Sequence, residues 1–281
     1  MSQLDLLFAA LREDPHAHAP GTAAYQRHKA GARALIEPLF SGTTAEPREF
    51  GPFGRLVLPY TRMGAIDSLD LFGLDELIIF TFYHANRARY RRVLDIGANL
   101  GLHSLIMARC GFTVQAFEPD PWHFGKLREN LAANIAATVT PVQAAVSIRD
   151  GEAQFVRVLG NTTGSHLAGA KDSYGEREMF TVATKAVAPL FAWADLAKID
   201  AEGHEKDLLL TTTRAVFDRL DIMVEIGSPA NAAAVFAHFD RIGVGLFAQK
   251  LGWQRARTVA DVPTSHREGS LFISAKAAMP W

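Results

Sequence analysis

The chain has 281 residues, of which 48% are hydrophobic and 21% are charged, and this composition excludes disordered, collagen-like and coiled-coil proteins. Its length fits one α/β domain with an extension, or two average domains. Because Lys and Arg number 29 and Asp and Glu number 30, the formal net charge is -1, so we expect neither nucleic acid nor a membrane as a partner.

The cysteine content and the first residues predict a cytoplasmic protein. The single cysteine, Cys110, cannot form an internal disulfide, and one thiol is too few for a structural zinc site. The first residues lack a positive region and reach Asp5 before an apolar run of signal-peptide length, so secretion is not expected. The apolar patch at residues 77–83 is far shorter than the roughly 20 residues that span a bilayer.

The first 90 residues are expected to form a helical extension with a short β element. Ser2 and Asp5 have the spacing of a capping box, and apolar side chains follow at helical spacing, namely Leu4, Leu7, Phe8 and Leu11. A second helical pattern runs to about residue 35. Glycines and prolines bound the β element within residues 50–60, and a third helix is expected over residues 75–90.

Beyond Arg92, short apolar runs alternate with helical segments, which is typical of βαβ units and a parallel sheet. Five strands are expected first, at residues 93–96, 113–117, 139–145, 197–199 and 222–225. Residues 151–189 predict a β pair and the polar loop GNTTGSH, and two more strands are expected near residues 244–250 and 271–274. The fold class is therefore α/β.

A glycine-bearing turn follows the first of these strands, in the segment VLDIGANLG at residues 93–101. Glycines in such a turn let a ligand approach the backbone closely. Asp95 stands near the end of the strand, and Glu118 ends the next strand, where nucleotide-binding folds present a carboxylate to ribose hydroxyls. The two acids and the turn predict an adenosine pocket.

The turn favours S-adenosylmethionine over a dinucleotide as the cofactor. A dinucleotide fingerprint needs glycines at positions 97, 99 and 102, where the chain has Gly97, Asn99 and Leu102. A pyrophosphate therefore lacks its binding turn, whereas S-adenosylmethionine carries no phosphate. An acid and an exposed turn backbone suit the methionine part of that cofactor.

Four segments resemble, in order and spacing, the FkbM-type S-adenosylmethionine-dependent methyltransferases: VLDIGANLGLHS (93–104), FEPDPWHFGKLRENLAAN (117–134), AAVS (144–147) followed by Asp150-Gly151, and KIDAEGHE (198–205). The resemblance covers roughly residues 93–226. It implies a Rossmann-like class I methyltransferase fold, with a seven-stranded, mostly parallel sheet flanked by helices and an antiparallel last strand. It also implies methyl transfer, usually to a hydroxyl of a saccharide or natural product.

With this resemblance, residues 1–90 are expected to be a cap over the active site and residues 91–281 the S-adenosylmethionine-binding methyltransferase domain. The resemblance implies cofactor contacts at Asp95, Gly97, Asn99, Gly101 and Glu118. Further contacts are expected at neighbouring positions of the same segments, namely Ala98, Ser104, Pro119, Ala145 and Asp200.

Acids at two adjacent strand ends predict the point of methyl transfer. Asp200 and Glu225 end the fourth and fifth strands, and Glu202 follows two residues after Asp200. These carboxylates can deprotonate an acceptor hydroxyl, hydrogen-bond it or hold a divalent metal, which is left open but not expected. His204, beside them, is the favoured general base.

Several alternatives stay open at this point. His103, in the glycine turn, and His166, in the polar loop, are further candidate bases. A non-catalytic cofactor-binding or scaffold module would retain the fold, but it would not need clustered acids at the transfer point. A nucleotide-linked oxidoreductase is disfavoured by the turn. Besides the saccharide or small-molecule acceptor, a second copy of the chain is an open partner.

Overall fold

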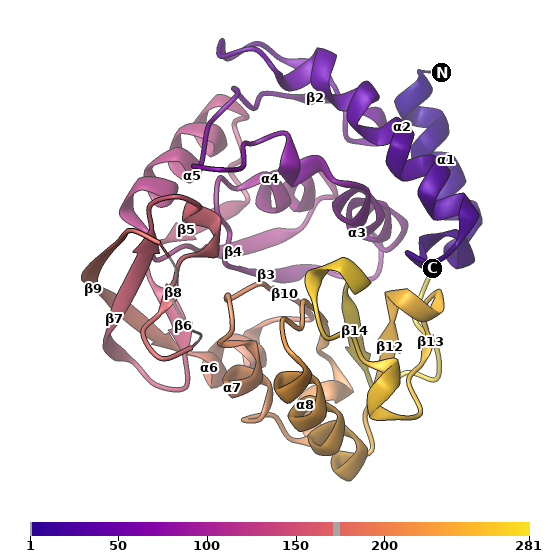
Figure 1. The fold of residues 1–281 in the computed structure, drawn as a ribbon, viewed down its shortest axis with the longest axis vertical. Helices are drawn as coiled ribbons and strands as arrows, with labels where there is room; N and C mark the ends of the chain where they lie inside the picture. Colours follow the sequence, from indigo (N-terminus) through magenta and orange to yellow (C-terminus); the bar gives the residue numbers. More distant parts are fainter. Residues whose placement is uncertain (1, 171–174) are drawn as a thin grey trace.

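The computed structural model describes residues 2–170 and 175–281. Its central feature is an eight-stranded sheet in the order β13-β12-β14-β11-β10-β3-β4-β5 (Figure 1). The strands are β3 (Arg92–Ile96), β4 (Thr113–Phe117), β5 (Val139–Val142), β10 (Leu196–Ile199), β11 (Asp221–Val224), β12 (Gly245–Ala248), β13 (Gln254–Arg255) and β14 (Leu271–Ser274).

The strand order confirms the predicted fold class. The five strands from β5 to β11 run parallel to their neighbours, whereas β14 is antiparallel to both β11 and β12. The sheet has one strand more than the seven expected, because the two-residue β13 pairs with the free edge of β12. Gly252 and Trp253 both have positive φ in the turn between these two strands, and this reverses the chain.

The strand expected at residues 139–145 is wrong as a single element. It divides into β5 and the three-residue β6 (Ala145–Ser147), and these belong to different sheets. The N–H of Ala144 bonds the carbonyl of Val142 at 3.0 Å, so the backbone turns sharply between them. Pro141 also lacks the N–H that a sheet strand would use.

A second sheet of four strands, in the order β6-β9-β7-β8, stands beside the main one (Figure 1). The expected β pair is confirmed as β7 (Gly151–Val158) and β9 (Arg177–Ala186), which are antiparallel. The polar loop GNTTGSH contains the 3-10 helix η4 (Thr162–Gly164) and leads into β8 (His166–Leu167). This sheet therefore presents its loop toward the main sheet.

The N-terminal extension starts with the predicted helix, α1 (Gln3–Glu13). Its capping box between Ser2 and Asp5 is confirmed, and the four expected apolar side chains are buried. The remaining elements are η1 (Pro15–His18), α2 (Ala23–Phe40), β1 (Arg48–Glu49), η2 (Gly51–Phe53), β2 (Arg55–Leu56), η3 (Asp70–Phe72) and α3 (Leu74–Ala85). Helix α3 is shorter than expected, because the side chain of Asn86 bonds the carbonyl of Phe82 and ends it.

Helices cover both faces of the main sheet (Figure 1). On one face, Leu77 and Phe80 of α3 pack in one apolar core with Val93 and Leu196 of the sheet. On the other face, a second core contains the alternate strand residues, such as Ile199. The remaining helices are α4 (Leu102–Arg109), α5 (Pro121–Ala133), α6 (Val187–Trp193), α7 (Glu205–Leu209), η5 (Arg214–Asp218), α8 (Pro229–Ile242), η6 (Gln249–Leu251), η7 (Val259–Asp261) and η8 (His266–Glu268).

Hydrogen bonds fasten the extension to the far edge of the sheet. Trp253 Nε1 donates to Nδ1 of the buried His18 at 2.8 Å, and burial lowers the pKa of His18 to about 4, so the ring is neutral and can accept. Gln249 Nε2 donates to Asp75 Oδ1 at 2.5 Å. Among the described residues, no helix is both long enough and apolar enough to cross a lipid bilayer.

Candidate active site

A cavity of about 840 Å³ opens at the carboxyl ends of β3, β4, β10 and β11. Strand β3 leads on to β4 on one side, and β10 leads on to β11 on the other, so the cavity lies where the strand order reverses. Ligands of open α/β sheets bind at such a point. Walls come from the extension, the strand ends, the polar loop and the start of α8.

The glycine turn is packed against the end of β10. Gly97 has φ +78, and a Cβ added to it would stand 1.9 Å from the backbone oxygen of Asp200. The N–H groups of Gly97 and Ala98 both bond the carbonyl of Phe117, at 3.0 and 2.9 Å. Only glycine fits this position, and its bare backbone lines the cavity.

Glu118 lies in the cavity wall with its carboxylate held from two sides. Its Oε2 accepts the N–H of Asn99 and its Oε1 accepts the N–H of Asp120, both at 2.9 Å. Burial raises the pKa of Glu118 to about 8, although these two bonds oppose the shift. The carboxyl group is therefore fixed in orientation beside the turn, as a ribose partner must be.

His123 of α5 joins the turn to the polar loop, a role that the sequence pattern did not reveal. Its Nδ1 is 2.6 Å from Asn99 Oδ1, and its Nε2 is 2.9 Å from Thr162 Oγ1. Burial lowers the pKa of His123 to about 4, so the ring is neutral. The N–H of Thr162 in turn bonds the carbonyl of Met63, which ties the extension to the same network.

The polar loop is also held through Asp120, which is almost completely buried at the start of α5. Arg157 of β7 donates to both carboxylate oxygens of Asp120, at 2.6 and 2.7 Å. Arg157 also bonds Glu178, and its guanidinium lies 4.9 Å from the centre of the Phe180 ring. The second sheet is therefore held beside the glycine turn.

Lys198 of β10 balances part of the negative charge of Asp200 and Asp95. Its Nζ lies 3.3 Å from Asp200 Oδ2, 3.4 Å from the Gly97 carbonyl and 4.0 Å from Asp95 Oδ1. Burial alone would lower the pKa of Lys198, but Asp200 and Asp95 raise it above its usual value. Asp95 itself is fully buried and accepts from Ser104 Oγ at 2.6 Å, and its Oδ1 has no hydrogen-bond partner among the described residues.

The expected acids at the transfer point do come together in the cavity. Asp200, Glu202 and Glu225 all line it. Burial and the neighbouring Asp200 raise the pKa of Glu225 well above its usual value. Glu205, which the sequence reasoning did not select, accepts the N–H groups of Ala201 and Gly203, and burial raises its pKa to about 7.

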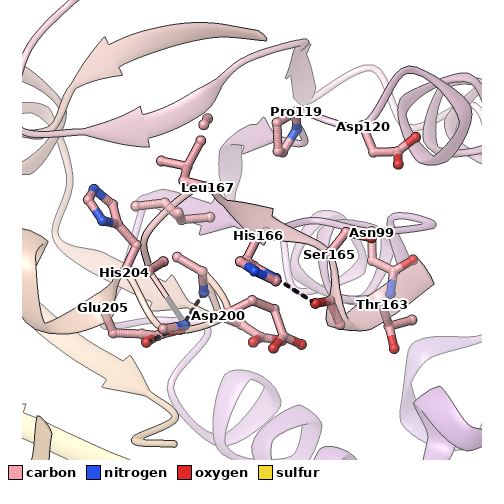
Figure 2. Close-up of a pocket in the computed structure, with 18 of the residues that line it drawn as sticks. Asn99, Pro119, Asp120, Thr163, Ser165, His166, Leu167, Asp200, His204 and Glu205 are labelled. Atoms are coloured by element: carbon pink, nitrogen blue, oxygen red, sulfur yellow. Dashed lines mark hydrogen bonds between the residues drawn. The ribbon is translucent and has the colours of Figure 1, made fainter. Parts of the chain in front are cut away.

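His204, the favoured base, lines the cavity at the start of α7. Figure 2 shows it on the opposite side of the pocket from Asn99 and Ser165. Its Nδ1 lies 3.2 Å from Asp207 Oδ2, and its Nε2 lies 3.3 Å from Ser147 Oγ. Burial lowers the pKa of His204, so the ring is neutral near pH 7.

The other predicted residues divide between the cavity and the layer beneath it. Those in the wall are Gly97, Asn99, Glu118, Pro119, Ala145, Asp200 and His166. The described residues of the wall do not include Asp95, Ala98, Gly101, Ser104 or His103. His103 contacts the wall indirectly, because it bonds Glu76, an acid of the extension that lines the cavity. In the described part of the chain, no three His, Cys, Asp or Glu side chains are grouped as metal ligands.

No model of a known protein family matches the chain. The hexuronic acid methyltransferase AglP of Haloferax volcanii is 29% identical over 137 residues, which are 47% of this chain and 54% of that protein. The chain thus spans about half the length of this curated relative. This relative carries the name of a methyltransferase, which agrees with the resemblance that the sequence motifs carry.

Two solved methyltransferase structures illustrate the structural likeness. The FkbM methyltransferase of Methylobacillus flagellatus has 14% identity and a TM-score of 0.39, with 73% of this chain and 52% of that chain covered. Precorrin-6y C5,15-methyltransferase of Geobacter metallireducens has 15% identity and a TM-score of 0.35, with 68% and 82% covered. The strand order of the main sheet and the antiparallel direction of β14 define the fold. The chain has the class I methyltransferase fold.

Proposed function

We propose that the chain is an S-adenosylmethionine-dependent O-methyltransferase that acts on a hydroxyl group of a saccharide or natural product. The observation that carries the proposal is one cavity that contains both the Gly97 turn with Glu118 and the acids at the next two strand ends. The relative from Haloferax volcanii, named as a hexuronic acid methyltransferase, supports methyl transfer to a sugar.

The residues of the turn fit the cofactor. Glu118 supplies a fixed carboxyl group for the ribose hydroxyls, and Gly97 leaves space for a ligand against the backbone. Asp200 supplies a negative charge for the positive methionine part, with Lys198 held behind it. The bound cofactor supplies an electrophilic methyl group on a sulfonium. The task of the protein is then to orient the acceptor oxygen and exclude water.

The remaining walls suit the acceptor. The extension supplies Ile66, Leu71 and Glu76, and the polar loop supplies Thr163 and Ser165. We propose that residues 1–90 form a cap of this kind over residues 91–281. Asp200, Glu202, Glu225 and His204 form the group that we propose to hold the acceptor hydroxyl near the methyl group.

The cofactor is tested by calorimetry with S-adenosylhomocysteine and with NAD. Binding of S-adenosylhomocysteine without NAD is expected, and binding of NAD alone would reject the proposal in favour of an oxidoreductase. Methyl transfer is tested by mass spectrometry after incubation of methyl-labelled S-adenosylmethionine with neutral, amino and acidic sugar glycosides and plant or microbial phenols. Cofactor binding with no labelled product from any of these acceptors would favour the scaffold alternative.

A further inference from the structure

Glu76 is the one acid of the described cavity wall that the extension supplies, and it stands in the first turn of α3. Its Oε2 lies 2.7 Å from Nε2 of His103, which is in the first turn of α4. Its Oε1 has no hydrogen-bond partner among the described residues. One carboxylate oxygen is therefore held by the protein, and the other is available to a ligand in the cavity.

Tyr83 determines which ring nitrogen of His103 carries the proton. The hydroxyl of Tyr83 lies 3.1 Å from Nδ1 of His103. Burial, together with the charges of Asp95 and Glu76, raises the pKa of Tyr83 well above its usual value, so the hydroxyl keeps its proton and donates it. Nδ1 then accepts from Tyr83, and Nε2 carries the proton that bonds Glu76.

The charges around Glu76 shift its pKa in the opposite direction from that of Glu225. Asp75 lies beside it on α3, Tyr83 and His103 lie behind it, and Lys198 and Glu225 face it from β10 and the end of β11. Burial raises the pKa of Glu76, but His103 and Lys198 outweigh burial and lower it.

The pKa of Glu225 shifts in the opposite direction, because burial and the charges of Asp200 and Glu76 raise it. The surroundings thus favour the ionised form of Glu76 and the protonated form of its neighbour Glu225. Two carboxyl groups with pKa values pushed apart divide the roles of base and acid between them.

We propose that Glu76 is the general base that takes the proton of the acceptor hydroxyl, and that Tyr83 and His103 position it. This inference rests on the proposed function. The acceptor oxygen forms its bond to the methyl carbon as the methyl–sulfur bond breaks, and sulfur keeps that electron pair. The hydroxyl proton passes to Glu76 Oε1, so the products are a methyl ether, S-adenosylhomocysteine and a protonated Glu76 that returns its proton to solvent.

His204 is less suited to this role, because both of its ring nitrogens are engaged. One contacts Asp207 and the other contacts Ser147, at 3.2 and 3.3 Å. Glu76, by contrast, points a carboxylate oxygen without a described protein partner at the cavity. The extension therefore brings more than a covering surface to the site.

The test uses the full chain, the acceptor found by the labelling experiment and the variants Glu76→Gln and Glu76→Asp. Removal of a general base costs about 10²- to 10⁴-fold in rate, so Glu76→Gln should lose at least about 10²-fold in kcat. Its Kd for S-adenosylhomocysteine should stay within about threefold of the parent. Glu76→Asp keeps the charge and should recover part of the rate. Glu129→Gln, an exposed acid of α5, is the matched control with parent kcat.

His103→Phe supplies a readout that a purely structural role would not change. Loss of the hydrogen bond removes the group that keeps the pKa of Glu76 low, so the acidic limb of the kcat–pH profile should move to higher pH. A parent-like kcat in Glu76→Gln, or an unmoved acidic limb in His103→Phe, would overturn the proposal. If Glu76→Gln does not fold, Glu76→Asp and His103→Phe decide. A parent chain that binds S-adenosylhomocysteine but methylates no acceptor overturns the proposed function first, before any variant is measured.

Discussion

Glu118 accepts the backbone N–H of Asn99 at 2.9 Å, so an acid at the end of β4 fixes the turn that follows β3. The same carboxyl group accepts the N–H of Asp120, which places it between two chain segments. Glu118 and the glycine turn therefore form one unit. A change in the protonation of Glu118 should therefore change the free energy of unfolding as well as the affinity for the cofactor.

Glu118→Gln should alter the pH dependence of stability. The pKa of Glu118 is about 8 in the folded chain and 4.5 in the reference state, so the folded state binds more protons between these values. The stability due to this group is complete below about pH 4.5 and is lost as pH rises toward about 8. The melting temperature of Glu118→Gln, relative to the parent, should therefore rise by about 10 °C between about pH 5 and about pH 9.

Differential scanning calorimetry at several pH values checks this, with the exposed Glu129→Gln as a control whose difference from the parent should stay constant. A flat difference for Glu118→Gln would contradict the prediction. The same variant should also bind S-adenosylhomocysteine at least about tenfold more weakly, since an amide cannot accept hydrogen bonds at both of its terminal atoms as the carboxyl group can.

Gly97→Ala should abolish cofactor binding. The added Cβ would stand 1.9 Å from the Asp200 oxygen, and φ is +78, so the turn and the end of β10 must move apart. We expect a loss of about 2–4 kcal/mol in the free energy of unfolding and of more than about 100-fold in affinity for S-adenosylhomocysteine. Gly111→Ala is the matched control, because φ is +84 there and no atom lies within 4 Å of the added Cβ. Equal affinities in the two variants would refute the clash.

His123→Phe should weaken cofactor binding without unfolding the chain. The change leaves Asn99 Oδ1 and Thr162 Oγ1 without the ring that joins them. Calorimetry should show about a tenfold loss of affinity for S-adenosylhomocysteine, which corresponds to about 1.4 kcal/mol. Trp122→Phe, at the neighbouring exposed position, should bind as the parent does. An affinity within twofold of the parent in His123→Phe would show that this bridge does not organise the site.

Arg157→Leu should destabilise the chain by about 2–3 kcal/mol, because the buried Asp120 carboxylate loses its charged partner. The remaining bonds from the N–H groups of Trp122 and His123 to Asp120 keep the loss below that of a fully isolated charge. Chemical denaturation measures the effect. Arg214→Leu removes an exposed i,i+4 pair with Asp218 and should cost less than about 0.5 kcal/mol. Similar losses of unfolding free energy in Arg157→Leu and Arg214→Leu would contradict the prediction that the burial of Asp120 makes its ion pair the more important one.

The parallel strands and the turn could be predicted because they are local patterns. The apolar run that ends near Asp95, the turn glycines and Glu118 each express a requirement of the segment in which they stand. The gathering of Asp200 and Glu225 in one cavity also follows from topology, because adjacent parallel strands end at the same edge. The division between β5 and β6 was not predicted. The apolar run continues through Pro141 and the turn at Ala144, and their effect on the strand depends on how it pairs with its neighbours.

Contacts between segments that are distant in the sequence could not be predicted from local patterns. His103 was considered as a base, but α4 turns it toward α3, where it bonds Glu76. His123 stands in a segment that was recognised, yet its partner Thr162 comes from a loop in the second sheet. Asp95 stands in a central strand covered on both faces, and the local pattern did not show that Ser104 bonds it beneath the turn. Its expected contact with the cofactor stays a prediction.

The bond between Asp75 and Gln249 sets an order of events during synthesis. Asp75 directly precedes Glu76, and its partner follows β12, so these groups are separated by most of the main sheet in the chain. Because a ribosome releases residues from the N-terminal side first, α3 emerges long before the segment that secures it. The wall that α3 supplies to the cavity can therefore take its final form only after β12 and its following turn have been made, and until then Asp75 lacks its bond to Gln249.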